Sequence, residues 1–171
     1  MSELVPAIVA RPADGYGVAG ISIERSVFTV MAAGETLGIP IASVRTIFRA
    51  SGITPIPLAP QEILGLVNLR GKIVTALSLR RRLGLPPDVS TVNALSVGIE
   101  HRGEDFALVV DAVREVVPLP EGRQIPVPSN IHAARAGFVR EVYQLESTIL
   151  TVLDLDALFD FVHVHQLAAA E

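Results

Sequence analysis

The sequence predicts a mainly β protein built from small barrels, with only short helices. Strand-like runs rich in Val, Ile, Leu and Phe are brief, and glycine, proline or a charged residue ends each of them. The 13 glycines and 12 prolines supply these turn signals. Short strands separated by frequent turns are typical of small β-barrels rather than of helical bundles or parallel sheets.

The first part of the chain begins with a predicted arm and continues as strands. Residues 1–20 are rich in glycine and proline and are expected to form a flexible N-terminal arm. A strand is expected from Ile21, followed by a turn at Ala33-Gly34-Glu35 and a returning strand. Residues 41–48 place apolar side chains at helical spacing, which predicts one or two helical turns with a buried face.

The segment from Gly65 to Leu85 is the most informative part of the sequence. Two apolar, β-prone stretches flank Arg70-Gly71-Lys72, which predicts a β-hairpin with a charged turn. Gly71 can supply the positive φ of a tight turn, and Arg70 offers planar donors to carboxylates or amides of a partner. Asn68 is expected to bond the backbone near this turn. A simpler interpretation of Arg70, as an ordinary surface arginine, stays open.

A short helix and a boundary follow the hairpin. The helix is expected over residues 79–83 and is closed by Gly84 and two prolines. Within it, Arg80-Arg81-Arg82 is interpreted as a solvated helix face. The boundary at 86–90 divides the chain into a first barrel subdomain at 21–85 and a second at 90–153, whose strands could exchange.

The second half repeats the pattern of paired strands. Residues 94–100 and 105–117 are expected to pair around the turn His101-Arg102-Gly103. The first part of 105–117 is apolar on both faces, which is typical of a strand buried on two sides. A third hairpin is predicted over 137–153, and Asp154 is expected to cap a final helix at 154–165.

Composition and charge favour protein partners. The formal net charge of -4 gives no basic footprint for nucleic acid. No apolar run approaches the roughly 18 residues of a spanning helix, so no direct membrane insertion is expected. No basic region precedes the first apolar stretch, which argues against a signal peptide. The chain is therefore expected in the cytoplasm, and the absence of cysteine is compatible with that location.

Motifs that suggest an enzyme lack their required context. The segment Gly15–Gly20 matches the dinucleotide fingerprint G-x-G-x-x-G, but a strand-like segment follows it where the fingerprint opens a helix. A dinucleotide-binding enzyme is therefore a remote alternative. The histidines form no i, i+4 pair, so no metal site is expected. Capping explains Asp154 and Asp156 better than acid–base chemistry does, and no catalytic residue or cofactor is expected.

An ordered set of segments carries a family resemblance. Asn68-Leu69-Arg70-Gly71, the aliphatic strand after it, Leu79–Gly84 and Val109–Val116 follow one another along the chain. Together they resemble the signature segments of the CheW family, the bacterial chemotaxis coupling proteins. The resemblance covers about residues 21–161. It implies a single CheW-like domain of two packed five-stranded SH3-like β-barrels, with an apolar groove between them.

The resemblance also implies a function and site residues. CheW proteins are non-enzymatic adaptors that couple the cytoplasmic tips of chemoreceptors to the regulatory domain of a CheA-type histidine kinase, in arrays at the inner face of the membrane. It assigns receptor binding to Arg70, Gly71, Val113 and Val116, and kinase or partner docking to Val44, Thr46 and Ile47. The alternative is a CheW-like scaffold of a chemosensory pathway with another output, such as pili or gliding.

The chain departs from the family's pattern at three places. Thr46 stands where the family often has a glutamate, a plausible internal partner for Arg70. The usual Pro and Asp of the strand after the turn are replaced by Thr75 or Ala76 and by Ser78. We therefore expect Arg70 to be held less firmly, or to pair with another acid, and the chain to be a divergent member.

Overall fold

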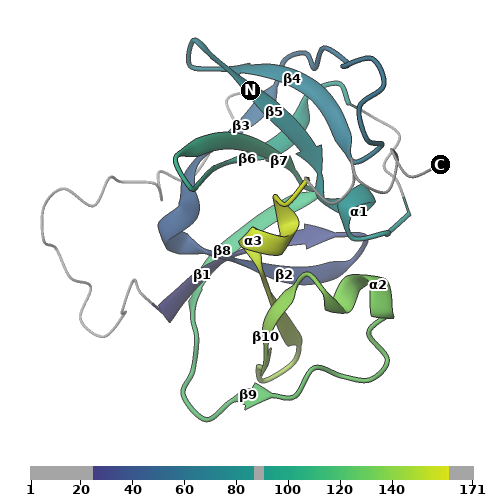
Figure 1. Ribbon diagram of the computed structural model, residues 1–171. Helices are drawn as coiled ribbons and strands as arrows, with labels where there is room; N and C mark the ends of the chain where they lie inside the picture. The colour runs from purple at the N-terminus through teal and green to yellow at the C-terminus, as the bar shows by residue number, and fades with distance from the viewer. Residues whose placement is uncertain (1–24, 87–90, 162–171) are drawn as a thin grey trace, which may run out of the picture.

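The protein folds as two packed β-sheets, which lie one above the other in Figure 1. The computed structural model describes residues 25–86 and 91–161. The predicted mainly β fold class, with two packed β units, is confirmed. The predicted arm at 1–20, with its glycine motif, lies outside the described residues, as do His163 and His165.

One sheet has six strands in the order β8-β1-β2-β11-β10-β9. Neighbouring strands are antiparallel except β2 and β11, which run parallel and pair Leu37 with Thr151. The strands are β1 (Ser26–Ala32), β2 (Glu35–Pro40), β8 (Ala112–Pro118), β9 (Gln124–Ile125), β10 (Val139–Gln144) and β11 (Ile149–Leu153).

The other sheet has five strands in the order β3-β6-β7-β5-β4. Its outer strands approach each other, because Thr54, just after β3, exchanges two backbone hydrogen bonds of 2.8 Å with Leu66 of β4. Gly65 permits this contact: a Cβ there would lie 2.1 Å from the Thr54 carbonyl oxygen. The contact closes the sheet into a barrel. The strands are β3 (Val44–Ala50), β4 (Ile63–Leu69), β5 (Lys72–Ser78), β6 (Ala94–His101) and β7 (Glu104–Val109).

The sheets do not coincide with the contiguous subdomains predicted at 21–85 and 90–153. β1 and β2 pair with β8 and β11, whereas β3, β4 and β5 share a sheet with β6 and β7. The halves of the chain therefore exchange strands. Hairpin signals identify neighbours within one hairpin, but the chain crosses between sheets at the β2–β3 and β7–β8 connections, which carry no such signal.

Two predicted elements are wrong. Residues 41–48 form a short 3-10 turn, η2 (Ile41–Ser43), and then β3, because pairing with β6 overrides an apolar spacing that also fits a helix. The single strand predicted at 105–117 is divided at Val110-Asp111. There the chain leaves the five-stranded sheet as β7 and enters the six-stranded sheet as β8.

The α-helices of the described residues are single turns: α1 (Leu79–Arg82), α2 (Ala133–Ala136) and α3 (Leu155–Leu158). Asp154 caps α3 as predicted, because its carboxylate accepts hydrogen bonds from the backbone N–H of Asp156 at 2.9 Å and of Ala157 at 3.2 Å. α3 is shorter than the helix predicted at 154–165, since Phe159 is already its C-cap.

The core of the described residues consists of three apolar clusters. The main cluster lies between the sheets and draws on both of them, with Val30 of β1 and Leu108 of β7 fully buried. Each sheet also encloses a smaller cluster, which includes Ala107 in the five-stranded barrel and Val27 in the six-stranded sheet. β7 is apolar on both faces as predicted, because Ala107 faces the barrel interior while Leu108 faces the other sheet.

Candidate partner-binding surface

The predicted charged turn is a two-residue turn between β4 and β5. Arg70 has a φ of +52° and Gly71 a φ of +85°, the backbone of a type I′ turn. Asn68 supports the turn, because its Oδ1 accepts a hydrogen bond of 2.9 Å from the Gly71 N–H. The turn thus holds the exposed Arg70 in a defined position at the end of the barrel.

Arg70 reaches across the end of the five-stranded barrel to β3. Its Nη2 donates a hydrogen bond to the Thr46 Oγ1 at 3.3 Å. Thr46 is buried and packs against Gly98 of β6, where an added Cβ would lie 2.7 Å from the Thr46 Cγ2. A neutral hydroxyl at this distance binds a guanidinium more weakly than a carboxylate does. No ion pair of Arg70 is found within residues 25–86 and 91–161.

The opposite face of β3 belongs to the space between the sheets. Val44 is 7% exposed and is a member of the main cluster. Ile47 is half-buried and packs against the same cluster from its margin. A partner can therefore contact Ile47 directly, whereas Val44 and Thr46 offer it little surface.

Val113 and Val116 lie on β8, at the edge of the six-stranded sheet. They pair with Val30 and Phe28 of β1 and are half-buried against the main cluster. Leu95 of β6 is half-buried against this cluster as well. The sequence around Leu95 did not predict that it would lie at this margin. The two sheets thus both contribute apolar side chains at the margin of the main cluster.

The predicted site residues fall into two groups. The turn group at the barrel end consists of Arg70, Gly71, Asn68 and Thr46. The margin group is formed by the side chains at the main cluster: Val44, Ile47, Val113 and Val116. β3 belongs to both groups, because Thr46 and Ile47 are neighbours on this strand and face opposite sides.

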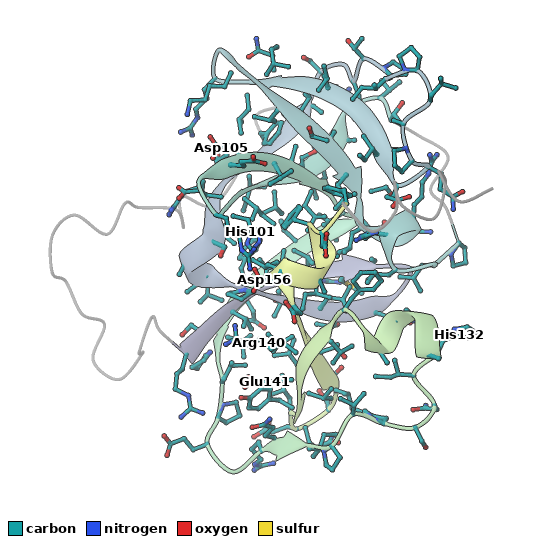
Figure 2. All side chains as sticks on the ribbon, in the orientation of Figure 1. His101, Asp105, His132, Arg140, Glu141 and Asp156 are labelled. Atoms are coloured by element: carbon teal, nitrogen blue, oxygen red, sulfur yellow. The ribbon has the colours of Figure 1, made fainter. Side chains whose placement is uncertain are left out.

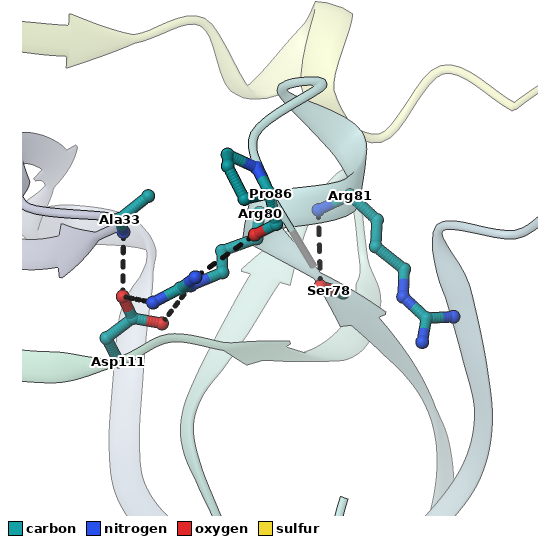
Figure 3. A network of polar contacts seen from close by, with 6 residues as sticks. All are labelled: Ala33, Ser78, Arg80, Arg81, Pro86 and Asp111. Atoms are coloured by element: carbon teal, nitrogen blue, oxygen red, sulfur yellow. Dashed lines mark hydrogen bonds and ion pairs between the residues drawn. The ribbon is translucent and has the colours of Figure 1, made fainter. Parts of the chain in front are cut away.

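An acidic residue that sequence reasoning did not single out fixes the start of β8. Both oxygens of Asp111 accept hydrogen bonds of 2.7 Å from the guanidinium of Arg80 on α1, and the Ala33 N–H donates to Oδ2 at 2.7 Å (Figure 3). The bonds from Arg80 hold the pKa of Asp111 below its ordinary value, against the opposing effect of burial. Asp111 therefore ties the strand of Val113 to the helix that follows the Arg70 hairpin.

The interpretation of Arg80-Arg81-Arg82 as a solvated face is wrong. The Arg82 side chain is 10% exposed and lies 3.2 Å from the carboxylate of Glu62, which is 11% exposed. Arg82 also donates to the carbonyl oxygens of Leu158, Ala157 and Asp160, at 2.9, 3.0 and 2.9 Å. Its guanidinium lies over the rings of Phe138 and Phe161. Arg82 thus connects α1 to the end of α3.

Ser78, one of the departures from the family's pattern, has a clear local role. It is the N-cap of α1, and its Oγ accepts a hydrogen bond of 3.3 Å from the Arg81 N–H. Serine and aspartate are comparable N-caps, so the helix keeps its cap despite the replacement.

The remaining polar clusters and pockets do not coincide with the predicted site. A pocket of 650 Å³ lies beside β2 and β11, and its lining includes Glu35 and Arg135, which form an ion pair. A second pocket contains His101, whose Nε2 lies 3.1 Å from the Asp156 Oδ1 (Figure 2). Within the described ranges no group of three or more His, Cys, Asp or Glu side chains could hold a metal ion. None of the helices described there is long and apolar enough to cross a membrane.

Comparisons with known proteins agree with this architecture. The sequence model of the CheW-like domain matches residues 26–163. A chemotaxis protein CheW of Rhizobium meliloti (strain 1021) is 29% identical over 119 residues, which cover 70% of this chain and 77% of the relative. A chemotaxis protein CheW of Bacillus subtilis (strain 168) is 24% identical over 142 residues, or 83% of this chain and 91% of the relative.

A solved structure shows the same fold. The crystal structure of the scaffolding protein TtCheW from Thermoanaerobacter tengcongensis matches with a TM-score of 0.70 and 28% sequence identity, over 80% of this chain and 93% of that one. CheW proteins are scaffold adaptors rather than enzymes. The family match spans both sheets and every predicted site residue, and the chain therefore belongs to the CheW family of chemotaxis scaffold proteins.

Proposed function

We propose that this chain couples the cytoplasmic tips of chemoreceptors to a CheA-type histidine kinase, in signalling arrays at the inner face of the membrane. The observation that carries the proposal is Arg70, an exposed arginine on a type I′ turn. Among the described residues it donates a weak hydrogen bond to Thr46 and forms no ion pair. An arginine in this state can donate to a partner without first breaking an internal ion pair.

Receptor binding would combine this arginine with apolar contacts. Val113 and Val116 on β8 retain part of their surface at the margin of the main cluster. A helical receptor tip that packs on these valines would gain affinity from apolar burial, while Arg70 and the Gly71 turn would set its position. The buried area would be small, so multivalency in the array would supply much of the binding strength.

Kinase docking would use the part of β3 that lies at the margin of the main cluster. Ile47 offers surface to a partner, whereas Val44 and Thr46 would act mainly by fixing the strand beneath it. The kinase would therefore contact the chain near the receptor site, with β3 shared between the two.

A binding experiment tests this proposal. We expect purified protein to form complexes with a soluble receptor-tip fragment and with the kinase regulatory domain, both encoded in the same genome. Arg70→Ala should weaken receptor binding and leave the circular dichroism spectrum unchanged. Absence of binding to both partners at high micromolar concentration would overturn the coupling function, and an unchanged receptor affinity of Arg70→Ala would remove Arg70 from the site.

A further inference from the structure

Among the described residues around the Arg70 turn, the other basic side chains pair with carboxylates of the chain, whereas Arg70 does not. The ends of β4 and β6 and the starts of β3, β5 and β7 meet at this end of the barrel. The internal ion pairs here are Arg45–Glu100 at 2.7 Å, Lys72–Asp105 at 3.3 Å and Arg102–Asp156 at 2.9 Å. In the described part of the chain, Arg70 donates a hydrogen bond to the hydroxyl of Thr46 and forms no ion pair.

A second arginine in the same local setting provides a direct reference. Arg102 occupies the first position of the β6–β7 turn, with a φ of +51° followed by Gly103 at +81°, as in the Arg70 turn. Both turns hold an arginine in a backbone conformation that favours asparagine or glycine. In the case of Arg102 the ion pair with Asp156 offsets this strain. Arg70 has the same strain, but no carboxylate of residues 25–86 and 91–161 pairs with it to offset that strain.

We infer that the carboxylate for Arg70 comes from the receptor, and that an aspartate or glutamate at the receptor tip is the feature by which this scaffold selects it. This inference rests on the proposed function. A guanidinium has five N–H donors, and Thr46 accepts from one of them. The others can form a bidentate pair with a carboxylate. Thr46 is then a specificity-determining residue, because a neutral side chain at this position leaves the charge of Arg70 available.

The test measures how variants of this chain respond to single changes in the receptor. The probes are a soluble receptor-tip fragment from the same genome and versions in which each tip carboxylate is replaced by its amide. They are titrated into wild-type protein, Arg70→Gln, Thr46→Glu and Arg102→Gln at low and high salt. Arg102→Gln is the matched control, because it removes the same charge from the same type of turn.

We expect Arg70→Gln to bind the unmodified fragment about 10-fold or more weakly and with a smaller salt dependence. One amide probe should bind wild-type protein about 10-fold or more weakly than the unmodified fragment does. The same probe and the unmodified fragment should bind Arg70→Gln with equal affinity, which is the result expected when Arg70 and that carboxylate pair directly. Thr46→Glu should also weaken binding, because it supplies an internal carboxylate. Arg102→Gln should bind like the wild type.

Two results would overturn the inference in distinguishable ways. If wild-type protein binds the fragment and every amide probe equally, and Arg70→Gln keeps the wild-type salt dependence, the receptor supplies no carboxylate although coupling stands. If wild-type protein binds no receptor fragment, both this inference and receptor coupling fail. Should the larger side chain of Thr46→Glu prevent folding, the cycle between Arg70→Gln and the amide probes decides alone.

Discussion

Two arginine-containing regions close together in the sequence have opposite surroundings in the structure. The arginines of α1 are engaged within the chain: Arg80 pairs with Asp111, and Arg82 with Glu62 and three carbonyl groups. Arg70, on the preceding hairpin, donates a hydrogen bond to the hydroxyl of Thr46 and forms no ion pair among the described residues. An arginine run in a sequence suggests a solvated surface. Here the run binds carboxylates and carbonyls of the fold, whereas the turn arginine has no carboxylate partner in the described part of the chain.

The largest expected effect comes from removing Arg82. Arg82→Met should lower the free energy of unfolding by about 3–5 kcal/mol, because the buried Glu62 carboxylate loses its ion pair and the carbonyls at the end of α3 lose their hydrogen bonds from the guanidinium. Urea denaturation measures this loss. Arg81→Met is the matched control from the same helix, since Arg81 donates one hydrogen bond from its side chain, to the Gln61 carbonyl. Equal losses in the two variants would contradict the structural role of Arg82.

A smaller effect is expected at Asp111, and it should depend on pH. Asp111→Asn should lower the free energy of unfolding by about 2 kcal/mol at neutral pH, because the bidentate pair with Arg80 is lost. The folded-state pKa of Asp111 is lowered, so its contribution is present above the unfolded pKa of about 4 and is lost as the pH falls through the lower folded value.

Denaturation of wild type and Asp111→Asn between neutral and strongly acidic pH tests this dependence. The difference between the two proteins should shrink as the pH falls below about 4, because the unfolded state then takes up a proton at Asp111 more readily than the folded state. The decrease should end below the lower folded-state pKa, where Asp111 is protonated in both states. A difference that stays constant across this range would show that Asp111 acts through shape rather than charge.

Local features of this fold could be predicted from sequence, and long-range ones could not. The Arg70-Gly71 turn and the Asp154 cap depend on nearby residues, and the structure shows both. The Arg82 contacts depend on carbonyls about 75 positions along the chain, which no local pattern encodes. Asp111 did give a signal that went unused: a charged residue in an apolar run, at the point where the chain changes sheets.

The candidate site divides in the same way. Its residues were predicted from a family resemblance. The structure then shows that Ile47 is partly exposed to solvent, whereas Val44 is buried. Leu95 was missed because its half-exposed position depends on how the two sheets meet. The internal partner of Arg70 could not be predicted from sequence either. Threonine at position 46, where the family often has glutamate, does not indicate whether another acidic residue pairs with Arg70.

The smallest expected effect distinguishes the two arginine turns from each other. Arg70→Asn should raise the free energy of unfolding by about 0.5 kcal/mol, because asparagine tolerates the positive φ and only a weak bond to Thr46 is lost. Arg102→Asn should give no such gain, since the same relief is offset by loss of the exposed pair with Asp156. Thermal or chemical denaturation of the two variants side by side measures the contrast.

A gain in stability that accompanies weaker receptor binding in Arg70→Asn would show that the turn retains arginine for recognition, at the expense of the fold. If the two substitutions change stability equally, the Arg70 turn has internal support equivalent to the Asp156 pair, and the contrast between paired and available arginines does not hold. The sign of the change in the free energy of unfolding therefore distinguishes an arginine that stabilises the fold from one that serves to bind a partner.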